Sequence, residues 1–270
     1  GPDGGQLGRK FPKFKSWEQR ADDRIARAET PSEEQIRSIR EQEQRRGAKN
    51  PCHAYDLTFS PPKSVSALWA ISSGEVAAAI EAAQDAAIDT AFEWIEANAA
   101  WTRTGATGQH HLRVEGLVAS RWEHRTSRSG DPQLHTHCAV FNRAKTVVDG
   151  KWRAVDGTSL FAGSAAGNSV YLAALERELT GRLGVAWKNG REAREIVGVP
   201  DDLCALWSKR SSDIRARIAD YLGNPEERGT IRYGARAHRK LMYKVIRETR
   251  DSKPDGPAAS PDQLRAGWKK

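Results

Sequence analysis

The sequence predicts a mixed α/β (α+β) fold, in which a central antiparallel β-sheet is flanked by long helices. Three observations lead to this prediction. Residues 53–60 (HAYDLTFS) alternate apolar and polar side chains, as a half-buried strand does. Residues 73–99 are rich in alanine and carry larger apolar residues near helical spacing. Residues 112–124 and 133–145 also resemble strands, and the polar loop between them favours an antiparallel pair.

The elements of the first hundred residues follow from the same patterns. Residues 1–50 are charged and have few large apolar residues, so a peripheral helical segment is expected there. The polar face of the first strand carries Asp56 and Thr58. The alanine-rich helix is expected to cover residues 65–99 or residues 73–99.

Three shorter patterns complete the predicted core. Residues 147–155 (VVDGKWRAV) predict a hairpin that turns at Asp149-Gly150. Residues 168–184 predict an amphipathic helix that ends at Gly184. Residues 185–198 predict a second short hairpin, turning at Asn189-Gly190.

The charge distribution separates the C-terminal part from this core. Residues 207–250 hold twelve Lys or Arg against five Asp or Glu, so this segment alone carries +7 of the formal net charge of +8. We therefore expect a core over residues 51–205, a basic helical segment over residues 206–250 and a flexible tail over residues 251–270. A basic chain with a sequence pI near 9.5 favours a polyanionic partner, and nucleic acid is the first candidate.

Other classes of protein are disfavoured by what the sequence lacks. Cys52, Cys138 and Cys204 show no CxxC spacing, which argues against a zinc ribbon or a disulfide framework and fits a reducing, cytoplasmic location. No stretch is apolar enough to insert into a membrane, and no signal peptide is evident. Gly1-Pro2 is typical of the remnant left by protease removal of a tag.

The motif that points to chemistry is the HxH pair in DPQLHTHCAVFN, residues 131–142. Side chains two apart on a strand share a face, so His135 and His137 project together while Leu134 and Thr136 face the other way. Two imidazoles that converge in this manner are suited to bind a metal ion. The sequence therefore predicts two ligands of a metal site on this strand.

A third imidazole is available at His124, where the preceding strand ends. An antiparallel pair would bring His124 within reach of the same ion as the other two histidines. The polar positions of its strand, which include Glu115 and Arg121, are out of phase with His124. A bulge near residues 120–122, or an early end of the strand, is therefore expected.

Three neutral imidazoles leave open positions on the ion, as a site that holds a substrate oxygen requires. Asp56 could accept the second ring N–H of a ligand histidine. Two alternatives stay open: the HxH histidines could be hydrogen-bonded strand residues without a metal, and Asp56 could simply face solvent. The remaining histidines are expected on the surface or in turns: His53, His110, His111 and His238.

Three segments together resemble a known family. They are YDLTFSPPKSVS at residues 55–66, EHRTSRSGDPQLHTH at residues 123–137 and GKWRAVDGTSLF at residues 150–161. Over about residues 51–205 the chain resembles the MobF conjugative relaxases, the TrwC/TraI-like members of the HUH endonuclease superfamily. The resemblance implies an HUH palm, a central antiparallel sheet flanked by helices, with a mobile C-terminal helical part that closes over single-stranded DNA.

The resemblance also implies an activity. Such relaxases nick one strand of plasmid DNA at an origin of transfer and stay attached to the 5′ phosphate through a tyrosine. Carried over, His124, His135 and His137 match the metal ligands, and Asp56 matches the acidic residue that orients a ligand histidine and assists the nucleophile. The implied ion is magnesium or manganese, although three imidazoles also suit zinc, nickel or copper. The implied partners are origin-of-transfer DNA, relaxosome accessory proteins and the coupling protein of a type IV secretion system.

The nucleophilic tyrosine has no counterpart at a matching position. The family's tyrosines precede the first strand, whereas no tyrosine precedes Tyr55 here. We therefore expect the chain to begin after the nucleophile, in which case it binds metal and DNA without cutting. Alternatively, Tyr233 or Tyr243 substitutes as the nucleophile. The simpler reading of those two tyrosines is packing of a C-terminal helix, while Tyr55 and Tyr171 are expected in the core.

DNA is expected to contact basic side chains and aromatic rings. Trp122 and Trp152 could stack a base, or pack in the core. Near the metal, the candidates for phosphate contacts are Lys63, Arg125 and Arg128. In the basic segment, the candidates recur near helical spacing, as they would on a merely soluble basic helix: Arg232, Arg236, Arg239, Lys240, Lys244 and Arg247.

The sequence thus favours a metal-dependent, strand-specific DNA endonuclease and transesterase. Relaxases of this family often continue into a helicase, and these residues contain no Walker A motif. Two other classes remain: a non-catalytic metal-containing DNA-binding module, and a three-histidine metallohydrolase that activates water.

Overall fold

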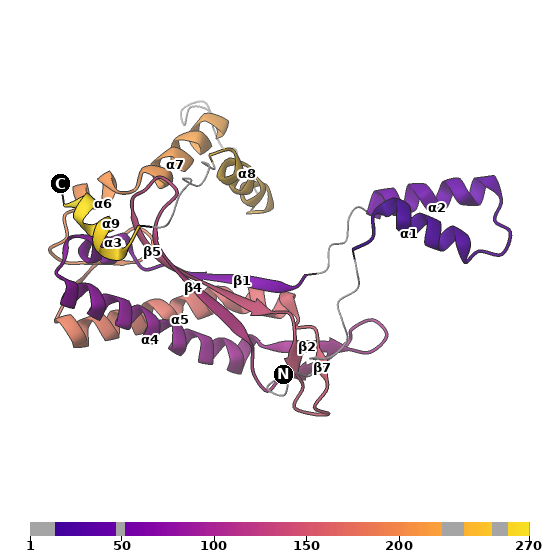
Figure 1. Ribbon diagram of the computed structural model, residues 1–270, viewed down its shortest axis with the longest axis horizontal. Coiled ribbons are helices and arrows are strands. Elements are labelled where there is room, and N and C mark those ends of the chain that lie inside the picture. Colours follow the sequence, from indigo (N-terminus) through magenta and orange to yellow (C-terminus); the bar gives the residue numbers. More distant parts are fainter. Residues whose placement is uncertain (1–13, 47–51, 223–234, 250–258, 270) are drawn as a thin grey trace. The chain divides into compact units, whose positions relative to one another are not determined.

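The computed structural model describes residues 14–46, 52–222, 235–249 and 259–269. The chain forms two compact units, and the elements are shown in Figure 1. One unit comprises Gly1–Asp56, Ala100–Ala119 and Ala139–Leu160, and the other comprises Leu57–Ala99, Ser120–Cys138 and Phe161–Lys270.

The N-terminal segment is helical, as predicted, but it consists of two helices, α1 (Trp17–Ala26) and α2 (Glu33–Arg46). They are separated by a turn in which Thr30 has a left-handed φ of 47°. The two helices are joined by Glu43, which is only 2% exposed. Its carboxylate accepts hydrogen bonds from three guanidinium groups, those of Arg20, Arg24 and Arg46. This charged junction adds to the apolar burial of Ala21, which is fully buried on α1.

A three-stranded sheet has the order β1-β5-β4, so β5 is its central strand. The strands are β1 (Ala54–Phe59), β4 (Ala119–Thr126) and β5 (Pro132–Phe141). A short loop joins β4 to β5, closed by the hydrogen bond from Ser127 N to Asp131 O at 2.8 Å. These strands confirm the predicted central antiparallel sheet.

The predicted strand over residues 112–124 is wrong in one respect, because it is two strands. β3 (His110–Arg113) pairs with β2 (Trp101–Thr104), a strand that the sequence patterns missed, and β4 starts only at Ala119. Between them the backbone turns to another partner, since Glu115 N donates to Lys145 O at 2.8 Å. His110 and His111 therefore lie on a strand rather than at a turn, although both are exposed as expected.

The first predicted hairpin forms with a wider turn, because residues 144–145 pair with residues 152–153 and the predicted strand residues 147–148 lie in the turn; the second forms where it was predicted. β6 (Ala144–Lys145) pairs with β7 (Trp152–Arg153) around Gly150, whose φ is 64°. β8 (Trp187–Asn189) pairs with β9 (Arg194–Ile196). The turn of the second hairpin is longer than the predicted Asn189-Gly190 dipeptide, because residues 190–193 connect its strands.

The helices of the second unit differ from prediction mainly at their ends. The two alternative helix starts are both real, because a break at residues 72–73 separates α3 (Lys63–Ile71) from α4 (Gly74–Ala99). The next helix, α5 (Gly157–Leu183), begins well before the predicted Asn168 and ends as predicted at Gly184, whose φ is 65°. The remaining helices are α6 (Asp201–Leu206), α7 (Lys209–Leu222), α8 (Ala235–Glu248) and α9 (Pro261–Trp268).

Helices α4 and α5 approach each other closely at two glycines one turn apart. A Cβ built on Gly163 would lie 2.4 Å from the Cβ of Ala99, and one on Gly167 would lie 2.9 Å from Ile95. The core beside this contact contains Tyr171, which is fully buried as predicted and donates its hydroxyl to Gln84 Oε1 at 2.6 Å. The early start of α5 therefore follows from packing against α4, which residues 157–167 do not reveal by pattern.

The expectation of a flexible tail over residues 251–270 is wrong for residues 261–268. They form α9, which begins with a capping box between Ser260 and Gln263. The ring of Trp268 packs edge-on against Trp69 of α3 with 5.9 Å between centroids, and its indole N–H donates to Gly130 O at 3.1 Å. A tryptophan near the end of a polar tail thus finds an aromatic partner about 200 residues away in sequence.

Candidate metal centre

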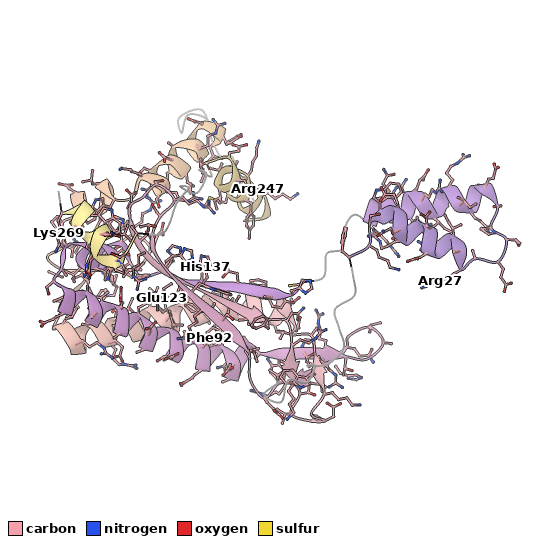
Figure 2. The ribbon with its side chains drawn as sticks, in the orientation of Figure 1. Arg27, Phe92, Glu123, His137, Arg247 and Lys269 are labelled. Carbon is pink, nitrogen blue, oxygen red and sulfur yellow. The ribbon has the colours of Figure 1, made fainter. Side chains whose placement is uncertain are left out.

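The histidines of the HxH motif lie on one face of β5. Leu134, Thr136 and Cys138 are buried on the opposite face, so the predicted alternation is confirmed. The ring centroids of His135 and His137 are 5.3 Å apart. Both rings are partly exposed, and His137 is labelled in Figure 2.

His124 completes a triangle with these two rings. Its centroid lies 5.1 Å from that of His135 and 5.2 Å from that of His137. The predicted bulge is not needed, because the break between β3 and β4 resets the alternation before His124. Within β4, Arg121 and Arg125 pair with Asp89 and Glu81 of α4, so His124 belongs to the other face.

Two of the rings are held by hydrogen bonds at Nδ1. The Nδ1 of His135 lies 2.9 Å from Gln133 O. A carbonyl oxygen only accepts, so Nδ1 of the neutral ring carries the hydrogen and the lone pair is at Nε2. The Nδ1 of His137 lies 3.1 Å from Thr58 Oγ1 on β1. Such contacts fix the tautomer and orientation of metal-binding imidazoles in other proteins.

The spacing of the rings fits a shared ion. With nitrogen about 2.1 Å from the metal and the ring centre about 1.1 Å beyond, tetrahedral directions put ring centres about 5.2 Å apart. As they stand, no three His, Cys, Asp or Glu side chains among the described residues are arranged to hold an ion. Binding of one ion would therefore require a movement of the rings, all three of which are partly exposed.

Residues 2–270 match the family model described as TrwC relaxase. This chain belongs to the TrwC relaxase family. The match extends over the N-terminal helices and the basic segment, beyond residues 51–205, which carry the resemblance in sequence motifs.

Relatives and solved structures agree with this membership. The multifunctional conjugation protein TraI of Escherichia coli is 33% identical over 185 residues, which are 62% of this chain and 10% of TraI. The chain thus spans about a tenth of the length of this curated relative. A metal-bound structure of the conjugative relaxase TrwC in complex with oriT DNA has a TM-score of 0.64 at 29% identity, covering 80% of this chain and 70% of that one. A TrwC complex with a 27-mer DNA comprising the recognition hairpin and the cleavage site has a TM-score of 0.65 at 28% identity, covering 80% of this chain and 71% of that one.

In this family member, the acidic residue predicted to support a histidine lies on β1. Asp56 is exposed and, two residues from Thr58, shares its face of the strand. Thr58, which was expected on that face without a role, contacts His137. The carbonyl of Gln133 was missed because any residue can supply a backbone acceptor.

The cations predicted near the metal are largely engaged within the protein. Lys63 Nζ donates to Pro132 O at 2.8 Å and to Gln133 Oε1 at 3.0 Å, and burial lowers its pKa. Arg125 contacts Glu81 at 2.9 Å and Glu123 at 3.0 Å, and the Glu81 hydrogen bond raises its pKa. Arg128 is partly exposed on the loop between β4 and β5. Phosphate contact by these residues stays a prediction, and for Lys63 and Arg125 it would require exchange of existing partners.

The basic segment is helical where it is described. Its helix α7 begins at Lys209, whose backbone N–H donates to the buried carboxylate of Asp131 at 3.0 Å, four residues before His135. Lys240 and Arg247 are exposed on α8. The side chains of Arg236 and Arg239, and all of Arg232, lie outside the described residues.

Four of the five tyrosines can be placed. Tyr171 is buried and burial raises its pKa, while Tyr55 is half-buried rather than in the core and donates to Val155 O at 3.4 Å. Tyr243 is 65% exposed on α8. Tyr221 on α7, which sequence reasoning overlooked, donates to Glu248 at 2.8 Å. Tyr233 lies outside the described residues.

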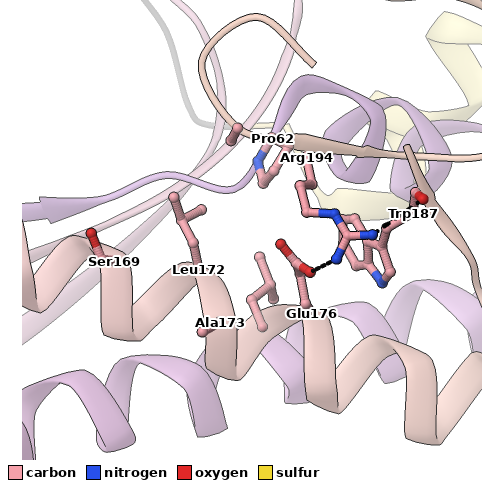
Figure 3. A pocket seen from close by; sticks show the side chains of 9 residues that line it. Pro62, Ser169, Leu172, Ala173, Glu176, Trp187 and Arg194 are labelled. Carbon is pink, nitrogen blue, oxygen red and sulfur yellow. Dashed lines mark hydrogen bonds and ion pairs between the residues drawn. The ribbon is translucent and has the colours of Figure 1, made fainter. Parts of the chain in front are cut away.

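A groove of about 360 Å³ lies beside α5, away from the residues of the candidate centre (Figure 3). Its floor contains the ion pair between Glu176 and Arg194 at 2.7 Å. The groove includes none of the three histidines. His124 and His135 line a separate, much smaller cavity of about 20 Å³. No helix among the described residues is long and apolar enough to cross a membrane.

Proposed function

We propose that this chain is the DNA-nicking domain of a conjugative relaxase, which cuts one strand at a defined position in an origin of transfer. The observation that carries the proposal is the triangle of imidazoles on one sheet face, with centroids 5.1–5.3 Å apart. Membership of the TrwC relaxase family and the oriT DNA in the solved TrwC structures support the choice of substrate.

His124, His135 and His137 would hold one divalent ion through their ring nitrogens. The ion, when bound, supplies a Lewis acid that offsets negative charge on the non-bridging oxygens of the scissile phosphate. We propose magnesium or manganese by family membership; the imidazole ligands alone would also suit zinc or nickel. The carbonyl of Gln133 holds the hydrogen of the neutral His135 ring at Nδ1 and so leaves the lone pair of its Nε2 for the ion.

Asp56 is proposed to orient a ligand histidine and to accept the proton of the nucleophile. Its support is its position on the same face of β1 as Thr58, which contacts His137. A carboxylate there would act alongside the threonine hydroxyl. Asp56→Asn, which keeps the shape and removes the charge, should lower the cleavage rate at neutral pH without abolishing DNA binding.

The reaction is a transesterification. A tyrosine oxygen forms a bond to phosphorus, the bond from phosphorus to the 3′ oxygen breaks, and that oxygen leaves as a hydroxyl after taking up a proton. The phosphotyrosine conserves the ester for later rejoining. Tyr55 and Tyr171 are poor candidates for the nucleophile because their hydroxyls are bonded and their pKa values are raised, mainly by burial. The hydroxyl of Tyr221 is also hydrogen-bonded, to Glu248, so the candidates for the nucleophile within this chain are Tyr233 and Tyr243.

Single-stranded DNA would be held by the basic segment, with Lys240, Lys244 and Arg247 as its described members. By their spacing in the sequence, Arg232, Arg236 and Arg239 are also proposed as DNA contacts, although their side chains lie outside the described residues. By family membership we also propose relaxosome accessory proteins and a secretion coupling protein as partners, and action in the cytoplasm.

A covalent-adduct assay tests the function. Labelled single strands tiled across the DNA that flanks the gene are incubated with the chain and manganese, and adducts are resolved on a denaturing gel. His135→Ala should abolish manganese binding measured by calorimetry, and any cleavage with it, whereas His110→Ala, an exposed histidine on β3, should leave both unchanged. Full manganese affinity in His135→Ala would refute the metal assignment.

The same assay separates the other functional classes. An adduct formed by this chain would place the nucleophile at Tyr233 or Tyr243. Metal-dependent cleavage without an adduct would instead identify water as the nucleophile, as in a three-histidine metallohydrolase. Strand-specific binding without cleavage is the result expected if the tyrosine lies outside this chain. If supplying a segment with that tyrosine still yields no adduct, the chain is a non-catalytic binding module.

A further inference from the structure

The two faces of β4 carry different side chains. Arg121 and Arg125 contact Asp89 and Glu81, which belong to α4. Because side chains alternate along a strand, Trp122 lies on the other face, together with His124. Trp122 therefore shares its sheet face with the candidate metal centre and is separated from His124 by one residue.

Trp122 is 52% exposed, which is unusual for the largest apolar side chain. Other tryptophans of the second unit have protein partners: Trp69 is fully buried, and the indole N–H of Trp187 donates to Thr180 Oγ1 at 3.0 Å. A single exposed apolar residue can occur without a function. Here the exposed indole lies on the strand that also carries His124, a proposed metal ligand. This position suggests that the indole contacts the substrate bound at the metal centre.

We propose that Trp122 is a stacking platform for a nucleobase next to the phosphate at the histidine triangle, an inference that rests on the proposed function. Residues two apart on a strand are separated by about 7 Å, a distance that a nucleotide spans between its phosphate and its base. Stacking on an aromatic ring is tolerant of base identity, so the platform fixes the strand rather than reading its sequence.

The surroundings favour a base over a protein segment as the occupant. β4 is an edge strand of the sheet, so the indole is approachable from the side without displacing another strand. The chain carries a formal charge of +8, which attracts a polyanion. DNA is also the ligand in the solved structures of TrwC. The alternative occupant, the edge of a second copy of this chain, is an outcome of the test.

The test compares Trp122→Leu, which keeps an apolar side chain but removes the aromatic face, with Trp122→Phe, which keeps a smaller one. Binding of fluorescent single strands is measured by anisotropy at fixed salt. Trp122→Leu should weaken binding about 5- to 150-fold, and Trp122→Phe should restore most of the loss. Phe14→Leu, at a position that is also 52% exposed, should bind normally. A strand that contains 2-aminopurine next to the cleavage position should be quenched by the unchanged chain and not by Trp122→Leu.

Several results would overturn the inference. They are normal affinity in Trp122→Leu, failure of Trp122→Phe to restore binding, unchanged quenching, or a dimer in the absence of DNA that Trp122→Leu dissociates. Calorimetric manganese binding by Trp122→Leu should match that of the unchanged chain, which shows that the variant is folded. If that variant binds DNA normally while His135→Ala loses manganese, only the platform is refuted; if the unchanged chain binds no single strand, the proposed function fails.

Discussion

Lys63 provides a test of whether a basic residue of the YDLTFSPPKSVS segment contacts DNA or stabilises the fold through internal hydrogen bonds. Its amine donates to Pro132 O at 2.8 Å and to Gln133 Oε1 at 3.0 Å. Lys63→Met keeps most of the side-chain volume and removes both donors. The two acceptors stand at the start of β5, and the carbonyl of Gln133 in turn accepts from His135.

The expected loss of stability follows from these bonds. A hydrogen bond with a charged partner contributes about 1.5–3 kcal/mol, so two would contribute about 3–6 kcal/mol. Burial lowers the pKa of Lys63, so its charged form is also destabilised, and replacing it recovers part of the loss. We expect a net decrease in the free energy of unfolding of about 2 kcal/mol, measured by urea denaturation.

The DNA-binding assay separates the two roles. Removing a phosphate contact lowers the slope of log K against log salt by about 0.7 for single-stranded DNA. Because the amine is already engaged, Lys63→Met should leave this slope unchanged, whereas Lys240→Met, on exposed α8, should lower it. If Lys63→Met left the stability unchanged and reduced the slope by about 0.7, the stabilising role of Lys63 would be refuted. Lys63 would then be a phosphate contact.

Three further predictions concern the scaffold. Gly163→Ala should destabilise the protein by about 1–3 kcal/mol in urea denaturation despite alanine's better helix propensity, because the new Cβ meets Ala99; an increase in stability would contradict that contact. Tyr171→Phe leaves the oxygen of Gln84 buried without this donor and should cost about 1–3 kcal/mol, so a thermal midpoint equal to that of the unchanged chain would rule out the bond. The pKa of Glu43 is lowered from 4.5 to about 2 by its hydrogen bonds to arginines. Its stabilisation of the α1–α2 pair is therefore present above pH 4.5 and is lost as the pH falls through about 2. The rate of amide hydrogen exchange in residues 17–46, corrected for intrinsic rates, should increase as the pH falls from 4.5 to about 2. In Glu43→Gln the same amides should exchange rapidly already at pH 6.

Local patterns determined much of the fold and the centre of the site. The alternation of residues 132–141 was sufficient to place His135 and His137 on one face, since a strand's period of two is a property of the backbone itself. Helix ends marked by glycine were equally predictable, as Gly184 with its φ of 65° illustrates. The basic balance and the motifs together indicated a DNA-acting protein of the relaxase family, and the family match agrees.

The partners of these residues were decided only by the tertiary structure. The phase of His124 depends on the break after β3, which arises because Glu115 bonds to Lys145, thirty residues later in the sequence. The engagement of Lys63 by the start of β5, and of Trp268 by Trp69, likewise joins segments far apart in the chain. Periodicity reports which face a side chain occupies, whereas a hydrogen-bond or ring partner depends on which other segment covers that face.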